Sequence, residues 1–279
     1  MQYHRPTTLA EALRLAAEPG ARVLAGGTDL VLRMRDGRER PDALVSLGRV
    51  AELAGVTFGA DRVRLGARTT LAELVEHEEL GRLFPALLGA ARVFGSMLVR
   101  NLATVGGNLC NASPCSDLAP PLIALGARVE LASREARREL PLGDFFVGPR
   151  ETRLAPGELL TAVVLDRPGP RDRSAVLKHT RVTVDLALVN VAVALELDRG
   201  KVARVRAVAG AVGPTPLRLL GVEALVAGQA LAPELLAEAG RRAGAEVKPI
   251  SDVRASAEYR RMLTGVLCRR ALAAAAEVS

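Results

Sequence analysis

The stretch Arg100–Gly126, RNLATVGGNLCNASPCSDLAPPLIALG, carries the most specific pattern in the chain. Its adjacent glycines, Gly106 and Gly107, have no Cβ atoms. A backbone needs such residues where it passes close to another group or adopts a positive φ. Downstream, Asp117 begins an apolar run that contains two prolines and ends at Gly126. Proline in the first turn and glycine past the last turn are typical of a helix. The stretch therefore predicts a glycine turn that feeds a short helix and presents free N–H groups to an anion.

A second pair of glycines lies near the N-terminus, in the segment Val23–Leu30, VLAGGTDL. A short apolar strand enters Gly26 and Gly27, and the chain leaves through Thr28 and Asp29, which could cap the next element. Two such loops can clamp one diphosphate. Each pair alone also fits an ordinary tight turn, because glycine is among the residues that dominate turns.

Length and composition place the chain among ordinary globular proteins. It has 279 residues, of which 49% are hydrophobic and 25% charged, enough for a sizeable core and two domains. No apolar run is long enough to cross a bilayer, and the N-terminal sequence MQYHRPTTLAEAL contains no apolar signal region. We therefore expect a cytoplasmic protein with no membrane insertion.

The net charge of +7 raises nucleic-acid binding as a hypothesis from a different class. Arginines concentrate in places, for example between Arg33 and Arg40, but acidic residues are interspersed nearly everywhere. Aromatic residues make up only 3%, and no tract alternates basic with stacking side chains. We interpret the excess charge as solvated surface and subunit interface and expect no nucleic-acid partner.

The three cysteines, Cys110, Cys115 and Cys268, do not fit a disulfide framework. Cys110 and Cys115 could be half of an iron–sulfur or zinc site, but such sites normally need four ligands and the third cysteine is remote. We expect no metal in this chain.

Local patterns predict mixed helices and strands in two parts. Thr8–Glu11 and Thr70–Glu73 read as helix capping boxes, and Val56–Ala67 reads as a hairpin. Early in the chain, a helix, a strand, the first glycine loop and a second strand over Ala43–Leu47 form an α/β unit. Arg167–Arg173 is the best candidate linker. Beyond it we expect three strands and three helices: strands at 175–179, 186–197 and 202–212, and helices at 218–227, 233–245 and 257–276.

Together these motifs resemble those of the FAD-binding, or medium, subunit of the molybdenum hydroxylases, the xanthine dehydrogenase and carbon monoxide dehydrogenase family. LAGGTDL at 24–30 is similar to the family's first flavin loop, and ATVGGNLCNASPCSDLAPPLIALGA at 103–127 to its second. LKHTR at 177–181, followed by Asp185-Leu186-Ala187, is similar to the family's lysine segment. The resemblance extends from Tyr3 to about Ala274, with the motifs in the family's order.

The resemblance implies an α+β fold with two domains. Residues 1–172 would form a two-part PCMH-type FAD-binding domain built from α/β subdomains. Residues 173–279 would form a CO dehydrogenase flavoprotein-like C-terminal domain, with a three-stranded antiparallel sheet packed on a helical bundle.

The resemblance also implies which residues bind the cofactor. The glycine loops would donate N–H groups to the pyrophosphate, and Thr28 and Asn108 would add side-chain bonds. Asp117 would contact the ribose or cap a helix, and Lys178 would place a positive charge beside the isoalloxazine or else lie on the surface. Phe94 is either a flavin contact or a core residue. The complete predicted set is Leu24, Ala25, Gly26, Gly27, Thr28, Asp29, Leu30, Phe94, Thr104, Val105, Gly106, Gly107, Asn108, Ser113, Asp117, Leu159 and Lys178.

By resemblance the chain is one subunit of an oxidoreductase and has no catalytic residue of its own, because FAD carries the redox step. His4, His77 and His179 all lie outside the glycine loops, so we expect non-covalent FAD. The expected partners are a large molybdopterin subunit, which determines the substrate, and a small [2Fe–2S] subunit, in a heterotrimer that dimerises. Electrons would pass from the clusters through FAD to NAD+, oxygen or a quinone.

Two alternatives remain open at this point. A self-sufficient FAD oxidase would need its own acid or base beside the flavin, and the sequence shows no motif for one. A basic, non-enzymatic binding protein would leave the paired glycine loops unexplained.

Overall fold

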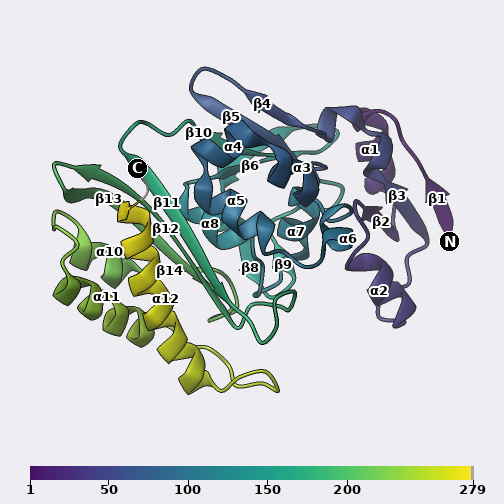
Figure 1. Ribbon diagram of the computed structural model, residues 1–279. Helices are drawn as coiled ribbons and strands as arrows, with labels where there is room; N and C mark the ends of the chain where they lie inside the picture. The colour runs from purple at the N-terminus through teal and green to yellow at the C-terminus, as the bar shows by residue number, and fades with distance from the viewer. Residues whose placement is uncertain (278–279) are drawn as a thin grey trace.

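The computed structural model describes residues 1–277, and the N-terminal part of the chain forms a small α/β layer (Figure 1). Its three strands are parallel, in the order β1-β3-β2. Helix α1 buries Leu9, Ala12 and Leu13 against this part of the chain, and the Thr8 hydroxyl accepts the Glu11 N–H at its start. The elements are β1 (Gln2–His4), α1 (Leu9–Ala16), β2 (Ala21–Leu24), α2 (Leu30–Arg35), β3 (Ala43–Ser46) and the 3-10 turns η1 (Leu47–Arg49) and η2 (Ala51–Leu53).

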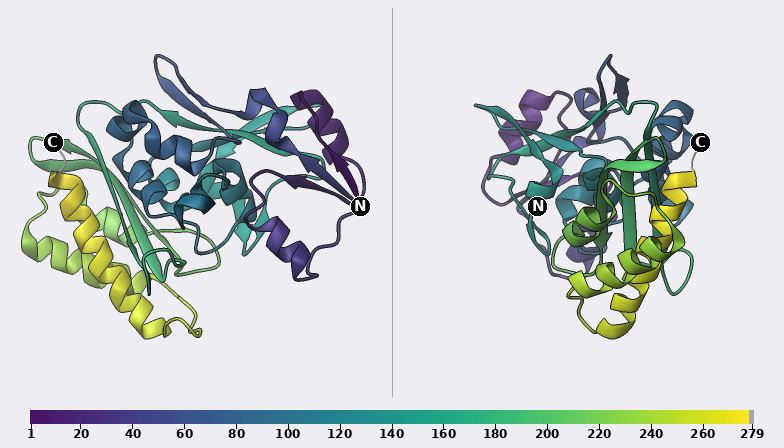
Figure 2. Two further views of the ribbon diagram at one scale, coloured as in Figure 1. Left: turned by 45° about the vertical axis from the view of Figure 1, so that its right-hand side comes forward. Right: turned by 90° about the vertical axis from the view of Figure 1, so that its left-hand side faces the viewer.

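A second, five-stranded antiparallel sheet comes next, in the order β4-β5-β10-β6-β7. Strand β10 is central, and only its last residue, Asp166, is exposed. Short helices pack on this sheet and fill the space toward the C-terminal domain (Figure 2). The elements are β4 (Val56–Phe58), β5 (Arg62–Gly66), α3 (Leu71–Glu76), α4 (Glu78–Leu83), α5 (Pro85–Arg92), α6 (Met97–Arg100), α7 (Val105–Asn111), α8 (Ala119–Ala124), β6 (Arg128–Ala132), β7 (Arg137–Pro141), α9 (Leu142–Phe145), β8 (Phe146–Gly148), β9 (Glu151–Thr152) and β10 (Leu159–Asp166).

The C-terminal domain is a long antiparallel sheet covered on one face by three helices (Figures 1 and 2). Three strands make up most of the sheet, as predicted, and a two-residue fourth strand extends it. The elements are β11 (Asp172–His179), β12 (Val189–Asp198), β13 (Lys201–Gly210), β14 (Leu217–Arg218), α10 (Leu220–Val226), α11 (Pro233–Glu246) and α12 (Ala257–Glu277).

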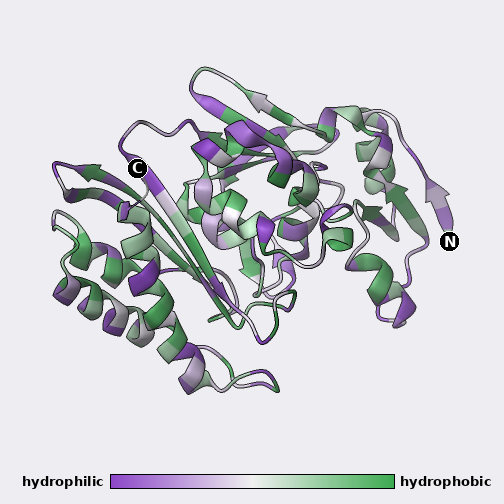
Figure 3. Cartoon of the chain, in the orientation of Figure 1, coloured by the Kyte–Doolittle hydropathy of each residue, from purple (hydrophilic) through white to green (hydrophobic). Residues whose placement is uncertain are grey.

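Strand β12 is buried on both faces, with its larger side chains on one face and its smaller side chains on the other. Val191 and Val193 pack in the core formed with the three C-terminal helices, whereas Ala192 and Ala194 pack with the core of the preceding part of the chain. Side chains alternate between the faces of a strand, so an alternating large and small pattern allows close approach of one neighbour. Figure 3 colours the chain by hydropathy, and the valine and alanine residues of strand β12 are hydrophobic.

Most of the predicted elements are confirmed. The Thr70–Glu73 capping box is complete, the hairpin of β4 and β5 forms at the predicted place, and the three C-terminal strands and helices lie where the pattern put them. The prediction of a glycine turn at Gly106 and Gly107 is wrong, since both residues lie in the first turns of helix α7. Helix α2 is absent from the predicted elements, because its six residues are too few to show a helical period.

None of the helices within residues 1–277 combines the length and apolar character that crossing a bilayer requires.

Candidate functional site

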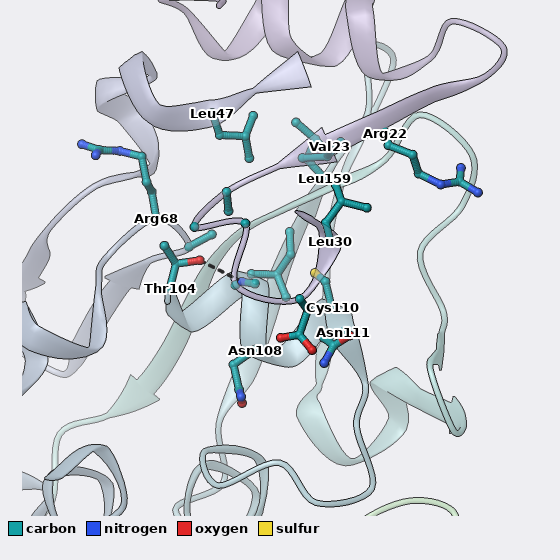
Figure 4. Close-up of a pocket in the computed structure, with 18 of the residues that line it drawn as sticks. Arg22, Val23, Leu30, Leu47, Arg68, Thr104, Asn108, Cys110, Asn111 and Leu159 are labelled. Atoms are coloured by element: carbon teal, nitrogen blue, oxygen red, sulfur yellow. Dashed lines mark hydrogen bonds between the residues drawn. The ribbon is translucent and has the colours of Figure 1, made fainter. Parts of the chain in front are cut away.

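A cavity of about 380 Å³ lies between the two glycine segments (Figure 4). Its walls come from the first glycine segment with helix α2, from helix α7, and from strand β10 with the loop before it. This volume is typical of small-molecule sites. The two segments that the sequence singled out, about 80 positions apart, therefore form one site.

The first glycine segment needs both of its glycines, for different reasons. A Cβ on Gly26 would lie 1.8 Å from the carbonyl oxygen of Leu102, which belongs to the loop before helix α7. Gly27 has a φ of +72°, which side chains disfavour. The backbone of the first glycine segment thus packs directly against the loop that precedes the second glycine segment.

The second glycine segment is a capped helix start rather than an open turn. The Thr104 hydroxyl accepts the Gly107 N–H at 3.0 Å, which is the bond drawn in Figure 4. The N–H groups of Val105 and Gly106 donate to the carbonyls of Thr69 and Ala67, at 2.9 and 2.8 Å. Because these donors already have acceptors, the expectation of free N–H groups at the second segment is wrong.

The free donors are in the first segment instead. Among the residues that the structure describes, no protein acceptor takes the backbone N–H groups of Gly26, Gly27, Thr28 and Asp29. They belong to a loop that borders the cavity and leads into helix α2. A row of free N–H groups is able to bind an anion.

Three arginines and three carboxylates line the cavity, and Glu39 pairs with Arg22 at 3.2 Å and with Arg33 at 3.8 Å. Arg33 on helix α2 lines it and donates a hydrogen bond to the side-chain oxygen of Asn111, at the end of helix α7. Arg22 and Arg68 line it as well. The sequence led us to interpret the arginines near Arg33 as solvated surface and subunit interface, and the structure shows that the Arg33 side chain is only 24% exposed. Its position shortly after the first glycine loop is the signal that could have identified Arg33 as a residue of the site.

Asn108 connects the cavity to the next helix. It lines the cavity, and its side-chain oxygen accepts the Ser116 hydroxyl at 2.6 Å. Ser116 in turn accepts the N–H of Ala119, the first residue of helix α8, at 3.2 Å. Among the described residues no acceptor takes the N–H donors of the Asn108 side-chain amide.

The Cys110 thiol also lines the cavity. Burial raises its pKa to about 12, so the thiol stays protonated and unreactive at neutral pH. Within the described residues no three His, Cys, Asp or Glu side chains are grouped to hold a metal ion.

Of the predicted cofactor residues, most line the cavity and five do not. Those that line it are Ala25, Gly26, Gly27, Thr28, Asp29, Leu30, Phe94, Thr104, Gly106, Gly107, Asn108 and Leu159. Those outside its lining are Leu24, Val105, Ser113, Asp117 and Lys178. Val105 is fully buried in the core, which explains its position.

Asp117 and Lys178 form a buried ion pair with each other. Their atoms Oδ2 and Nζ are 2.8 Å apart, and the side chains are 8% and 5% exposed. Lys178 is therefore not a surface lysine, and Asp117 does not cap helix α8. Lys178 also donates to the carbonyl of Val93 at 3.2 Å, next to Phe94 in the cavity wall. Burial raises the pKa of Asp117, and the ammonium of Lys178 offsets part of that rise.

Comparisons with known families and proteins cover nearly the whole chain. The family described as the FAD binding domain in molybdopterin dehydrogenase matches residues 1–168, and the CO dehydrogenase flavoprotein C-terminal domain matches residues 175–275.

Individual relatives extend this match. The xanthine dehydrogenase FAD-binding subunit of Escherichia coli O157:H7 is 33% identical, over 98% of this chain and 95% of its own. The carbon monoxide dehydrogenase medium chain of Afipia carboxidovorans is also 33% identical, over 97% and 94%. The reconstituted CO dehydrogenase from Oligotropha carboxidovorans contains a chain that superimposes with a TM-score of 0.96 at 32% identity, covering 100% of this chain and 98% of its own.

Proposed function

The chain belongs to the FAD-binding subunits of the molybdenum hydroxylase family, and on that premise we propose that it passes electrons from the [2Fe–2S] clusters of a partner subunit, through FAD, to an external acceptor. Bound FAD supplies the redox chemistry, and the protein supplies binding, orientation and electrostatics. The single observation that carries the proposal is the cavity shared by the two glycine segments.

The residues around the cavity fit FAD. A diphosphate needs hydrogen-bond donors and positive charge, which the free N–H groups of residues 26–29 and the guanidinium of Arg33 offer on one wall. Asn108 offers amide donors on the opposite wall, while Leu30, Phe94 and Leu159 offer apolar surface. We propose that the first glycine segment supplies the backbone donors for the diphosphate. The second segment positions that site by close packing.

We also propose that Asp117 and Lys178 act from behind the cavity wall. Lys178 holds the carbonyl of Val93 and so fixes the backbone beside Phe94. Its charge is compensated by Asp117, which limits the field that it can exert on the cavity. Their role is then to link the two domains and so to fix the position of the cavity wall beside Phe94.

Non-covalent attachment of FAD fits the chemistry of the wall. No histidine is among the described residues that line the cavity, and the Cys110 thiol has a pKa of about 12. A thiol that stays protonated is a poor nucleophile toward the flavin. FAD held by these groups should be released by acid.

The partners are inferred from the family. We propose that this chain assembles with a large molybdopterin subunit and a small [2Fe–2S] subunit as a heterotrimer that dimerises, with NAD+, oxygen or a quinone as acceptor. We further propose that its two domains divide between residues 172 and 173, close to the ends of the two family matches at residues 168 and 175.

A visible absorption spectrum tests the proposal. The purified chain is mixed with FAD, desalted, and measured before and after acid precipitation. We expect a retained two-band flavin spectrum, with all of the flavin in the acid supernatant. Flavin that stays with the precipitated protein would contradict non-covalent binding. Failure to retain flavin both in the chain alone and in a complex co-expressed with its two partner subunits would contradict the proposed function.

A further inference from the structure

A second concave region, a groove of about 700 Å³, lies at the seam between the two domains, beside the linker. One side comes from the segments before helix α5 and after helix α8, and the other from strands β12 and β13. The groove shares no lining residue with the cavity of the glycine segments. It therefore has no role in the proposed binding of FAD.

The groove is strongly basic. Seven arginines and three carboxylates line it. Four of the arginines are paired with carboxylates, as in Arg128 with Asp166 at 2.7 Å and Arg204 with Glu196 at 2.7 Å. Arg82, Arg173 and Arg206 form no ion pair within residues 1–277, whereas the other four arginines of the groove do. Three guanidinium groups of the groove thus have no carboxylate within ion-pair distance, although Arg206 also lowers the pKa of Asp166 through its charge.

Arg206 reaches across the seam onto the FAD-binding domain. It projects from strand β13, and a Cβ on Gly126 would lie 2.6 Å from its Nη1 atom. Gly126 comes after helix α8 and has a φ of +76°. The absence of a side chain at Gly126 is therefore what gives the Arg206 guanidinium its place in the groove.

Arg173 is held by the linker itself. Its Nη1 donates to the carbonyls of Pro170 and Asp172, at 2.7 and 3.0 Å. A guanidinium carries five N–H donors, so this arrangement fixes the head group and leaves most of its donors available. Fixed arginine forks match the geometry of phosphate oxygens.

We propose that the groove binds a small organic phosphate that carries two or more phosphate groups, of about the size of a nucleoside di- or triphosphate. The volume falls within the range of small-molecule sites, and a concave basic surface concentrates anions. Leu125, partly buried, supplies apolar surface for the organic part of the ligand. The requirement for several phosphates comes from three unpaired guanidinium groups arranged around one groove.

Calorimetric titration of the full chain, saturated with FAD so that the cofactor cavity is filled, tests this proposal. The probes are ATP, tripolyphosphate and adenosine. We expect ATP and tripolyphosphate to bind and adenosine not to bind, with an affinity that falls as salt is added. Removing one charged donor should weaken ATP binding by about tenfold, in Arg206→Gln and in Arg82→Gln alike.

The matched control is Arg134→Gln, an exposed arginine outside the groove, which should leave ATP binding unchanged. Thermal unfolding of each variant shows whether it folds. Absence of ATP binding would overturn the proposal, and so would ATP binding that falls equally in Arg134→Gln and Arg206→Gln. Binding of an acidic peptide without binding of either phosphate probe would also overturn it and assign the groove to a protein partner. Because FAD content is measured separately, failure here leaves the cofactor result unchanged.

Discussion

Lys178 Nζ lies 2.8 Å from Asp117 Oδ2 in a buried contact that joins the C-terminal domain to the FAD-binding domain. Two hydrogen bonds accompany it on the same segment: the Asn190 side chain donates to the carbonyl of Ser116, and the Ala211 N–H donates to the carbonyl of Pro114. The segment that connects helices α7 and α8 is therefore anchored from the C-terminal domain. Because of these three contacts, the stability of the cavity wall beside this segment should depend on both domains.

Breaking the ion pair should be costly. Lys178→Met leaves the Asp117 carboxylate buried without its partner, which we predict lowers the free energy of unfolding by about 3–5 kcal/mol. Asp117→Leu combined with Lys178→Met should cost less than Lys178→Met alone, because no unpaired charge remains. Urea unfolding of the three proteins measures these differences.

A surface ion pair provides the control. Arg14 and Glu18 are 3.1 Å apart on helix α1, with side chains that are 55% and 46% exposed. Arg14→Met should lower the free energy of unfolding by no more than about 0.5 kcal/mol. Equal effects of Arg14→Met and Lys178→Met would show that the buried pair does not join the domains as described.

Asp252 should make stability depend on acid pH. Burial alone would raise its pKa, but the N–H groups of Arg254 and Ala255 and the guanidinium of Arg260 outweigh burial and hold the pKa at about 2, below the ordinary 3.8. A carboxyl whose folded pKa is lowered contributes stability that is present above its unfolded pKa and lost as pH falls toward its folded pKa. Because Asp252 is an exposed residue and solvent screens its contacts, we predict that Asp252→Asn costs only about 1 kcal/mol at neutral pH.

The difference between wild type and Asp252→Asn should shrink as the pH falls through the window from 3.8 to about 2. Urea midpoints measured from neutral pH down into this window track the change. A difference that stays constant down to the lowest pH would contradict the assigned contacts of Asp252.

Thr104 should matter for the structure of the second glycine segment. Thr104→Ala removes the acceptor of the Gly107 N–H, and loss of such a cap costs about 1 kcal/mol. Thr104→Ser keeps the hydroxyl and should retain most of the stability. Thermal unfolding compares the two variants, and an equal loss in both would assign the effect to the methyl group rather than to the hydrogen bond.

Arg33 should contribute directly to cofactor affinity. Arg33→Gln removes a partly buried positive charge from the cavity wall, and we expect FAD affinity to fall by about tenfold, the effect of one charge-assisted hydrogen bond. Quenching of flavin fluorescence measures the affinity. Arg35→Gln, on the same helix but outside the cavity lining, is the control and should bind FAD as the wild type does.

Much of the fold could be predicted from local sequence. The Thr70–Glu73 capping box and the alternation along Val189–Asp198 depend on neighbouring residues alone, so the sequence predicts both the helix and the strand. The alternation of valine and alanine also indicates how this strand contacts both domains, since the valines face one core and the alanines face the other.

The details of the site depended on contacts that are distant in the sequence. The glycines at 106 and 107 predicted a turn, but carbonyls of Ala67 and Thr69 take the N–H groups that the prediction left free. No local pattern shows that Leu102 packs against Gly26, or that Lys178 pairs with Asp117. These are tertiary contacts, which the periodicity of single elements does not encode.

The affinity of FAD for two glycine variants with matched backbones shows whether the first glycine segment binds the cofactor. Gly27, in the cavity wall, and Gly200, in the hairpin between β12 and β13, have φ values of +72° and +76°. Gly27→Ala and Gly200→Ala therefore impose similar backbone strain, of about 1–2 kcal/mol. We predict that Gly27→Ala weakens FAD binding at least about tenfold, whereas Gly200→Ala destabilises the protein but binds FAD as the wild type does. Equal FAD affinities in the two variants would contradict a cofactor site at the first glycine segment.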